Sequence, residues 1–163
     1  QLADLPWISL DSLISGQGSR PLMRIFGELA SSEQVSEINN LILKNFSLRR
    51  VIESVTILDT AKAINQVEQF LLRYEHLAGC DVPNDRKVAL YVHISCLIER
   101  LIRNASPSHY SGRQCPQSEL ATLREAFSVI ESGYSVKIPV VELCYIHDIL
   151  TRETEFIQED QEF

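Results

Sequence analysis

The sequence predicts an all-α protein, a bundle of five to six helices. Apolar residues recur at spacings of three and four through most of the chain, which is typical of amphipathic helices. Serine, aspartate, proline and glycine stand where such helices begin or end, and no segment alternates as a strand does. The 163 residues, 45% of them hydrophobic, are long enough to bury a core in one domain of this kind.

Residues 1–50 are predicted to be a partly irregular connector with one or two helices. Helical turns are expected at Leu10–Ile14 and at Leu22–Ala30. The first full helix is expected after Ser31, because a serine followed by acidic side chains and a spaced apolar run is typical of a capped helix start. The apolar spacing of that helix ends near Asn45.

Residues 51–152 are predicted to form the main helical domain. The stretch after Leu48 is rich in β-branched residues, and we interpret it as a helix that leads into the next one. The further helices are expected to run from the cap Asp59 to Gly79, to open at Pro83, to run from Gln117 to Gly133, and to open at Pro139. Residues 105–116 are expected to be a loop, and the acidic residues 153–163 a frayed tail.

Charge and motifs exclude several classes of function. With 15 Lys+Arg against 22 Asp+Glu the net charge is −7, so a direct contact with nucleic acid is not expected. No apolar run has the length of a membrane span and no secretory signal pattern is present, so we expect a cytoplasmic protein or a piece of one. No nucleotide-binding, hydrolase or metal-binding motif occurs, so no enzyme, cofactor or metal site is predicted.

The four cysteines do not have the spacing of a metal site or of a disulfide scaffold. They stand 16, 19 and 29 residues apart, at Cys80, Cys96, Cys115 and Cys144. Cys96 and Cys144 lie within apolar helical patterns, where a free thiol behaves as a small hydrophobic side chain. We expect all four to be reduced and structural.

His93 stands out because it lies in the middle of the most apolar predicted helix. Steps of three and four along that helix place on one stripe the residues Arg86, Ala89, His93, Cys96, Arg100 and Arg103. Small neighbours leave the ring accessible, and a neutral imidazole with an ordinary pKa near ~6.5 is a nucleophile at cellular pH. A phosphoryl group would add about −1.5 to −2 charges, which the arginines can balance. The geometry also allows an ordinary hydrogen-bonded helix histidine.

Two segments resemble a known family. Asn84, Leu90, His93 and Ile98-Glu99-Arg100-Leu101 resemble the N…LxxHxxxxIERL signature of PTS regulation domains (PRDs), the helical modules that the sugar phosphotransferase system phosphorylates on histidine. Ile138-Pro139, Glu142 and Tyr145-Ile146 resemble the later IPxxExxYI helix of the family. The residues Leu5 to Gly18 resemble the connector before the C-terminal PRD of sigma-54-dependent activators of the levanase-regulator type.

The resemblance implies a regulatory domain of a transcriptional activator. His93 would accept a phosphoryl group from the phosphocarrier protein or from a sugar-specific enzyme IIB, with Arg100, Arg86 and Asn84 supporting the phosphate. Modification would change oligomeric state and the transcription of sugar-utilisation genes. A homodimer that buries part of the His93 helix is expected, because PRDs of the family pair.

The other histidines do not match the acceptor pattern. Many PRDs have a second acceptor seven residues after the glutamate of the last helix, and that position is Ile149 here. His147 lies two residues earlier, on another face of the helix, and we interpret it as a surface histidine. His76 is expected to interact with the C-terminal dipole of its helix, and His109 to lie on the surface of a loop. A single acceptor favours the activator branch over antiterminators.

Two alternatives remain beside the phosphorylated module. A constitutive helical dimerisation module would use His93 only for packing, and His93→Ala would then change stability but not signalling. A fragment of an RNA-binding antiterminator is disfavoured by the net charge of −7.

Overall fold

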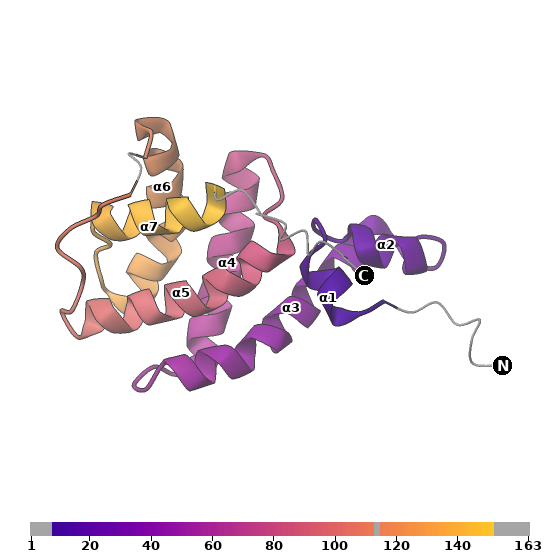
Figure 1. Cartoon of the computed structure of the whole chain (residues 1–163), viewed down its shortest axis with the longest axis horizontal. Coiled ribbons are helices and arrows are strands. Elements are labelled where there is room, and N and C mark those ends of the chain that lie inside the picture. The colour runs from indigo at the N-terminus through magenta and orange to yellow at the C-terminus, as the bar shows by residue number, and fades with distance from the viewer. Residues whose placement is uncertain (1–7, 113–114, 152–163) are drawn as a thin grey trace, which may run out of the picture.

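The computed structural model describes residues 8–112 and 115–151, and within these ranges the protein has seven helices and no strand. The helices are α1 (Leu10–Ile14), α2 (Arg20–Phe26), α3 (Ser32–Ser54), α4 (Thr60–Ala78), α5 (Asn84–Ile102), α6 (Gln117–Tyr134) and α7 (Val140–Thr151) (Figure 1). The all-α prediction is confirmed, with α3 to α7 as the bundle. α1 has the bounds predicted for the first helical turn of the connector, whereas α2 begins at Arg20 and ends at Phe26, not at Ala30. The tail 153–163 lies outside the described residues.

α3 is longer than the sequence predicted. Its start is as expected: the Ser31 side chain accepts a hydrogen bond from the Gln34 backbone, and the Gln34 side chain accepts one from Ser31 N–H. The helix does not end near Asn45 but continues to Ser54, so that the β-branched stretch belongs to α3 and not to the next helix. Tertiary packing overrides the weak local propensity here, because Val51 is fully buried. The predicted domain boundary between residues 50 and 51 falls inside α3.

The start and the end of α4 and the start of α5 are as predicted. Asp59 caps α4 by accepting hydrogen bonds from the backbone of Ala61 and Lys62. Gly79 ends α4 in the left-handed conformation with φ of 67°, which glycine adopts without steric cost. Pro83 directly precedes α5.

The predicted end of α6 at Gly133 is wrong. The helix continues through Gly133 to Tyr134, and Ser135 adopts the left-handed conformation that ends it. A Cβ atom at position 133 would lie 2.7 Å from Oε1 of Gln66 on α4. Gly133 therefore lies within α6, next to the Gln66 side chain of α4, and is not a helix stop.

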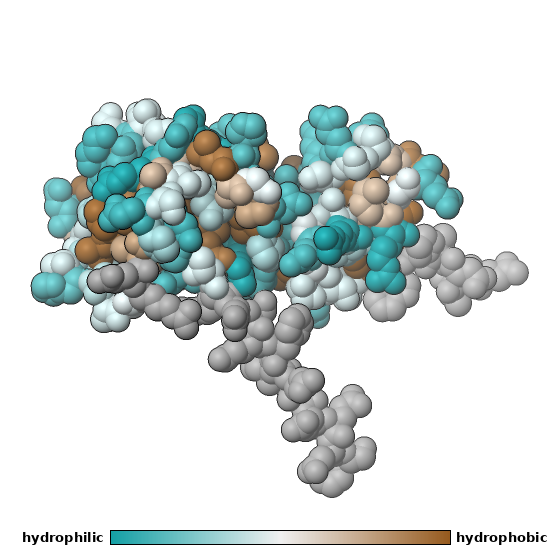
Figure 2. All heavy atoms as spheres, turned by 90° about the horizontal axis from the view of Figure 1, so that it is seen from above, coloured by the Kyte–Doolittle hydropathy of each residue, from teal (hydrophilic) through white to brown (hydrophobic). Residues whose placement is uncertain are grey.

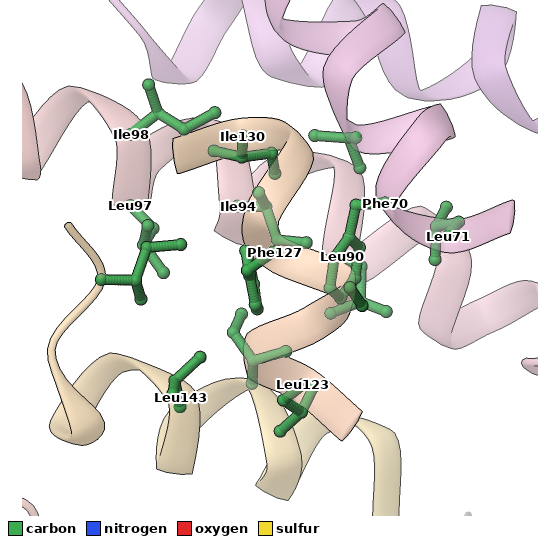
Figure 3. Packing of buried hydrophobic residues seen from close by; sticks show 14 of the residues in the cluster. Phe70, Leu71, Leu90, Ile94, Leu97, Ile98, Leu123, Phe127, Ile130 and Leu143 are labelled. Atoms are coloured by element: carbon green, nitrogen blue, oxygen red, sulfur yellow. The ribbon is translucent and has the colours of Figure 1, made fainter. Parts of the chain in front are cut away.

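α5 is the central helix of the bundle, as its largely apolar circumference predicts. It contacts α1, α3, α4 and α7, while α6 packs against α4 and α7. Figure 3 shows the core between them, in which the rings of Phe70 and Phe127 lie 4.2 Å apart at their centroids, near Leu90 and Ile94. A second, smaller apolar cluster joins α1 and α2 to the start of α3.

The face seen from above Figure 1 is mostly polar, with small separate apolar patches (Figure 2). Within the described ranges, no helix is long and apolar enough to cross a membrane, and no group of His, Cys, Asp or Glu could hold a metal ion.

All four cysteines are free. Cys115 and Cys144 are buried, whereas Cys80 is exposed and so is not a core residue. Burial raises the pKa of the Cys115 thiol to about 11 and also raises the pKa of the Cys96 thiol. Because the thiolate is the reactive form, these two side chains are expected to be inert at neutral pH.

Candidate functional site

His93 is exposed on the outer face of α5. Its neighbours Leu90, Ile94 and Leu97 point into the core and are fully buried. Because side chains on a helix rotate by about 100° per residue, these three fix the helix so that position 93 faces outward. The imidazole is therefore held on a rigid element and not on a loop.

His93 lies in the wall of a cavity of about 620 Å³. Three parts of the chain surround this cavity: α5, the loop of residues 105–112, and α7. Its polar lining consists mainly of His93, Arg100, Tyr110, Glu142, Tyr145 and Asp148. The structure thus brings His93 and Arg100 to one site, as their seven-residue spacing predicts.

Arg100 forms a two-pronged ion pair with Glu142 of α7. The Nε atom lies 3.1 Å from Oε1, and an Nη atom lies 2.7 Å from Oε2. The side chain of Glu142 is 1% exposed and that of Arg100 is 39% exposed. The hydrogen bonds to Glu142 raise the pKa of Arg100 further above its usual range. A buried carboxylate is thus neutralised by an arginine that also reaches the cavity.

The loop side of the cavity is held by Tyr110. Its hydroxyl donates a hydrogen bond of 2.6 Å to Asp148 of α7, and its ring lies edge-on to that of Tyr145 at 5.0 Å. Burial and the hydrogen bond to Asp148 raise the pKa of Tyr110. A Cβ atom at Gly112 would lie 2.2 Å from the Tyr110 hydroxyl, so only glycine allows the loop to pass this close.

A second hollow, of about 400 Å³, lies on the other side of His93. Arg50, Glu53 and Ser54 at the C-terminal end of α3 line it together with His93. Arg50 also lies over the ring of Phe46, 5.3 Å from its centroid. Sequence reasoning missed Arg50, Tyr110 and Asp148, and it named Glu142 only as part of the family motif. Periodicity along one helix carries no signal for residues of other elements.

Asn84 is not brought to this site. It lies nine residues before His93, which is a rotation of about 180° on a helix and places it on the opposite face of α5. The side chain is fully buried, and its amide donates hydrogen bonds to the carbonyl oxygens of Leu13 at 2.7 Å and Gly18 at 2.9 Å. Its oxygen accepts a hydrogen bond from Asn39 at 3.2 Å. Asn84 therefore fastens α5 to the connector and to α3.

Arg86 shares the stripe of His93 but is not part of the cavity lining. It donates a hydrogen bond to the carbonyl oxygen of Leu150 near the end of α7. Together with the Arg100–Glu142 pair, this contact shows that α7 runs antiparallel to α5 along the His93 face.

The interpretation of His147 as a surface histidine is wrong. The residue is buried between α6 and α7, and its Nε2 atom pairs with the carboxylate of Glu119. His147 lies on the face of α7 that packs into the core, and Glu119 at the start of α6 is its polar partner. Ile149, in contrast, lines the same cavity as His93.

The two remaining histidines lie outside the site, as predicted. His76 is exposed in the last turn of α4. His109 is exposed in the loop, where its carbonyl oxygen accepts a hydrogen bond from the Tyr145 hydroxyl at 3.3 Å.

These features define a class of protein: an all-α domain that presents an exposed histidine beside an arginine paired with a buried glutamate. The model of the PRD domain family matches residues 68–153, which is more than half of the chain. The chain belongs to this family, and the resemblance to PTS regulation domains is confirmed.

The chain is also similar to the transcriptional regulatory protein DagR of Salmonella typhimurium (strain 14028s / SGSC 2262). The two are 24% identical over 159 residues, which cover 91% of this chain. The chain spans only 17% of the length of that relative. No solved structure matches the chain.

Proposed function

We propose that this chain is the regulatory domain of a transcriptional activator and that the sugar phosphotransferase system phosphorylates it on His93. One observation carries the proposal: His93 is exposed on a PRD fold and shares a cavity with Arg100. The donor would be the phosphocarrier protein or a sugar-specific enzyme IIB. The similarity to a protein named as a transcriptional regulator supports the larger role.

The acceptor chemistry requires little of the protein. A ring nitrogen of neutral His93 attacks the phosphorus of the donor's phosphoryl group, the bond from phosphorus to the donor breaks, and a P–N bond to His93 forms. The imidazole gains the phosphoryl group and releases a proton. The domain catalyses no turnover; it holds the imidazole where a partner protein can reach it.

Arg100 would convert the modification into a structural change. A phosphate on His93 brings about two negative charges to a cavity in which Arg100 already neutralises Glu142. The phosphate and Glu142 then compete for one guanidinium group. When Arg100 turns to the phosphate, the buried carboxylate loses its partner, so the packing of α7 on α5 weakens. Arg50 is a second cation within the surroundings of His93.

The finer parts of the proposal follow from the resemblance to the levanase-regulator type. The full-length protein would be a sigma-54-dependent activator in the cytoplasm, and this domain would act as a homodimer without contacting nucleic acid itself. Modification at His93 would shift its oligomeric state and thereby transcription of sugar-utilisation genes.

The test is transfer of labelled phosphate from phosphoenolpyruvate through enzyme I and the phosphocarrier protein, with and without candidate IIB proteins. We expect acid-labile, alkali-stable label on the wild-type chain and none on His93→Ala. His76→Ala is the matched control, because it removes an exposed histidine far from the cavity and should label normally. Circular dichroism of each variant shows that it is folded.

Two results would contradict the proposal. Label that persists in His93→Ala would move the acceptor to another histidine. Absence of label from every donor would favour the alternative, a constitutive helical interaction module in which His93 only packs.

A further inference from the structure

The hollow of about 400 Å³ beside His93 lies between α3 and α5. These two helices pack along each other (Figure 1), and the hollow is found where the C-terminal end of α3 passes the middle of α5. Its α5 wall consists of Val88, Ala89, Val92 and His93. Ala89 stands one turn before His93, and its methyl group leaves room beside the imidazole ring. A group attached to the ring therefore has space on the α3 side.

The α3 wall of this hollow carries a cation that no carboxylate holds. Arg50 is exposed, and the described part of the chain provides no ion pair for its guanidinium group. The group lies over the ring of Phe46, which is a weak contact at an exposed position. Arg50 can therefore turn to a new anion without leaving a carboxylate unpaired. Several other arginines are engaged with a glutamate, namely Arg49, Arg73, Arg100 and Arg103.

The other polar groups of the α3 wall are already used. Glu53 accepts a hydrogen bond from Nε of Arg49 at 2.9 Å, so part of its charge is offset. The hydroxyl of Ser54 donates to the carbonyl oxygen of Arg50 at 2.6 Å. Arg50 is therefore the side chain of this wall that can donate to an anion.

The cavity on the α7 side of His93 is less favourable for an anion. Its lining includes two carboxylates, those of Glu142 and Asp148, and one guanidinium group, that of Arg100. Arg100 can reach a phosphate only by giving up the buried Glu142. Arg50 gives up only a contact with an aromatic ring. The balance of charges thus favours the α3 side for the first contact with a phosphoryl group.

We propose that Arg50 binds the phosphoryl group of phosphorylated His93 and so ties the C-terminal end of α3 to α5. A guanidinium group presents parallel N–H donors that match two oxygens of a phosphate. The contact forms only after modification, because it needs the charge of the phosphoryl group. This inference rests on the proposed function, in which His93 is the acceptor, and it gives Arg50 the role of positioning the phosphoryl group.

Phosphoramidate allows a test without any partner protein. A ring nitrogen of His93 attacks the phosphorus, the P–N bond of phosphoramidate breaks, and a P–N bond to the imidazole forms. Ammonia leaves with the ring proton as ammonium. The exposed His76, in the last turn of α4, is modified in the same sample and serves as an internal reference. Phosphorus NMR then follows the acid dissociation of each phosphoryl group, and His93→Ala identifies the His93 signal.

The expected readout is the acid dissociation constant of the phosphoryl group on His93. A guanidinium group beside it favours the dianion, so Arg50→Gln should decrease this constant at least about threefold and leave the His76 group unchanged. Arg50→Lys keeps the charge without the two-pronged geometry and should retain part of the effect. Arg24→Gln is the matched control, since it removes an exposed arginine of α2 and should change neither signal.

Hydrogen exchange tests the tie between the two helices. Phosphorylation of the wild type should slow exchange of the backbone amides of residues 50–54 at least about threefold, because the end of α3 is then held to α5. The same treatment of Arg50→Gln should leave these amides unchanged. Far-UV circular dichroism shows whether each variant is folded, and Arg50→Ala replaces Arg50→Gln if that variant is not.

An acid dissociation constant that is the same in Arg50→Gln and in the wild type would overturn the inference. So would an equal change in Arg24→Gln, which would indicate a long-range effect of charge and not a contact, or phosphoramidate that modifies His76 but not His93. Failure of the proposed function is distinguishable from these results. In that case the phosphotransferase donors leave His93 unlabelled, while the effect of Arg50 on the phosphoramidate-modified chain persists.

Discussion

Two residues of the family signature near opposite ends of α5, Asn84 and Arg100, are held by different kinds of contact. At the first end, Asn84 is tied to Leu13, Gly18 and Asn39 by hydrogen bonds between neutral groups. At the other end, Glu99 and Arg100 are held by contacts that depend on ionised groups.

The neighbours Glu99 and Arg100 face different parts of the fold. Glu99 accepts hydrogen bonds of 2.8 Å from both the backbone and the hydroxyl of Thr56, and it pairs with Arg103 at 2.7 Å. It therefore holds the α3–α4 connection, while Arg100 holds Glu142 of α7. The signature residues therefore serve mainly to hold neighbouring helices together through hydrogen bonds and ion pairs.

This difference between neutral and ionic contacts indicates which contacts of α5 a phosphate on His93 would affect. A new negative charge on His93 leaves neutral amide contacts nearly unchanged but competes directly for Arg100. The charge on His93 lies on the same face of α5 as Arg100, whereas Asn84 lies on the opposite face. We therefore expect modification to loosen the C-terminal end of α5 and to leave its connection to α1 and α3 in place.

The largest effect is expected for Arg100→Ala. Loss of the arginine leaves the fully buried Glu142 without its ionic partner, which should lower the free energy of unfolding by about 3 kcal/mol at pH 7. Urea unfolding at pH 7 measures it.

Arg49→Ala is the matched control, because it removes an arginine from an exposed ion pair with Glu53. It should cost at most about 0.5 kcal/mol. Equal losses of unfolding free energy in the two variants would show that the Arg100–Glu142 pair contributes no more to stability than an exposed ion pair.

Asn84→Ala should be the next most damaging change. Among the described residues, it leaves the buried carbonyl oxygen of Gly18 and the amide of Asn39 without a partner, and it removes the shorter of the two hydrogen bonds to the carbonyl oxygen of Leu13, at a cost of about 2 kcal/mol. The loss should be the same from about pH 5 to about pH 8, because none of these groups titrates there. Hydrogen exchange should show faster opening of α1. Asn65→Ala, at an exposed position of α4, is the control, and a strongly pH-dependent loss would contradict the neutral network.

Glu99→Gln should have a smaller effect, and in contrast to that of Asn84→Ala it should depend on pH. The hydrogen bond from the Thr56 backbone lowers the pKa of Glu99 in the folded state, despite its burial. A lowered folded-state pKa gives stability that is complete above the unfolded pKa of about 4.3 and is lost as the pH falls through the folded value. Wild type and variant should therefore differ in melting temperature at pH 7 and converge towards about pH 3. A difference in melting temperature that stays constant with pH would show that the negative charge of Glu99 does not stabilise the fold.

Helix boundaries were predictable where the signal is local. Asp59, Gly79 and Pro83 act on their own backbone, so the sequence alone places the ends of α4 and the start of α5. The continuation of α3 beyond Asn45 and of α6 through Gly133 depends on packing against other helices. Local rules carry no information about that packing.

The same distinction applies to the site. The spacing of His93 and Arg100 on one helix was sufficient to bring them together, and the spacing of Asn84 places it on the opposite face. Glu142 and Tyr110 come from α7 and a loop, and only the fold places them beside His93. The burial of His147 could not be predicted either, because it depends on which face of α7 meets α6.

His147→Leu should have the smallest effect and provides a contrast with Arg100→Ala. Both residues pair with a glutamate, but the Glu119 side chain is 49% exposed and can be hydrated when its partner is removed. Among the described residues, Nδ1 of His147 is buried without a hydrogen-bond partner, so an apolar replacement removes an unsatisfied atom and should cost at most about 1 kcal/mol. Urea unfolding at pH 7 beside Glu119→Gln measures this. A loss as large as that of Arg100→Ala would mean that exposure of the carboxylate partner does not govern what these pairs contribute, and the contrast between a buried and a hydrated glutamate would fail.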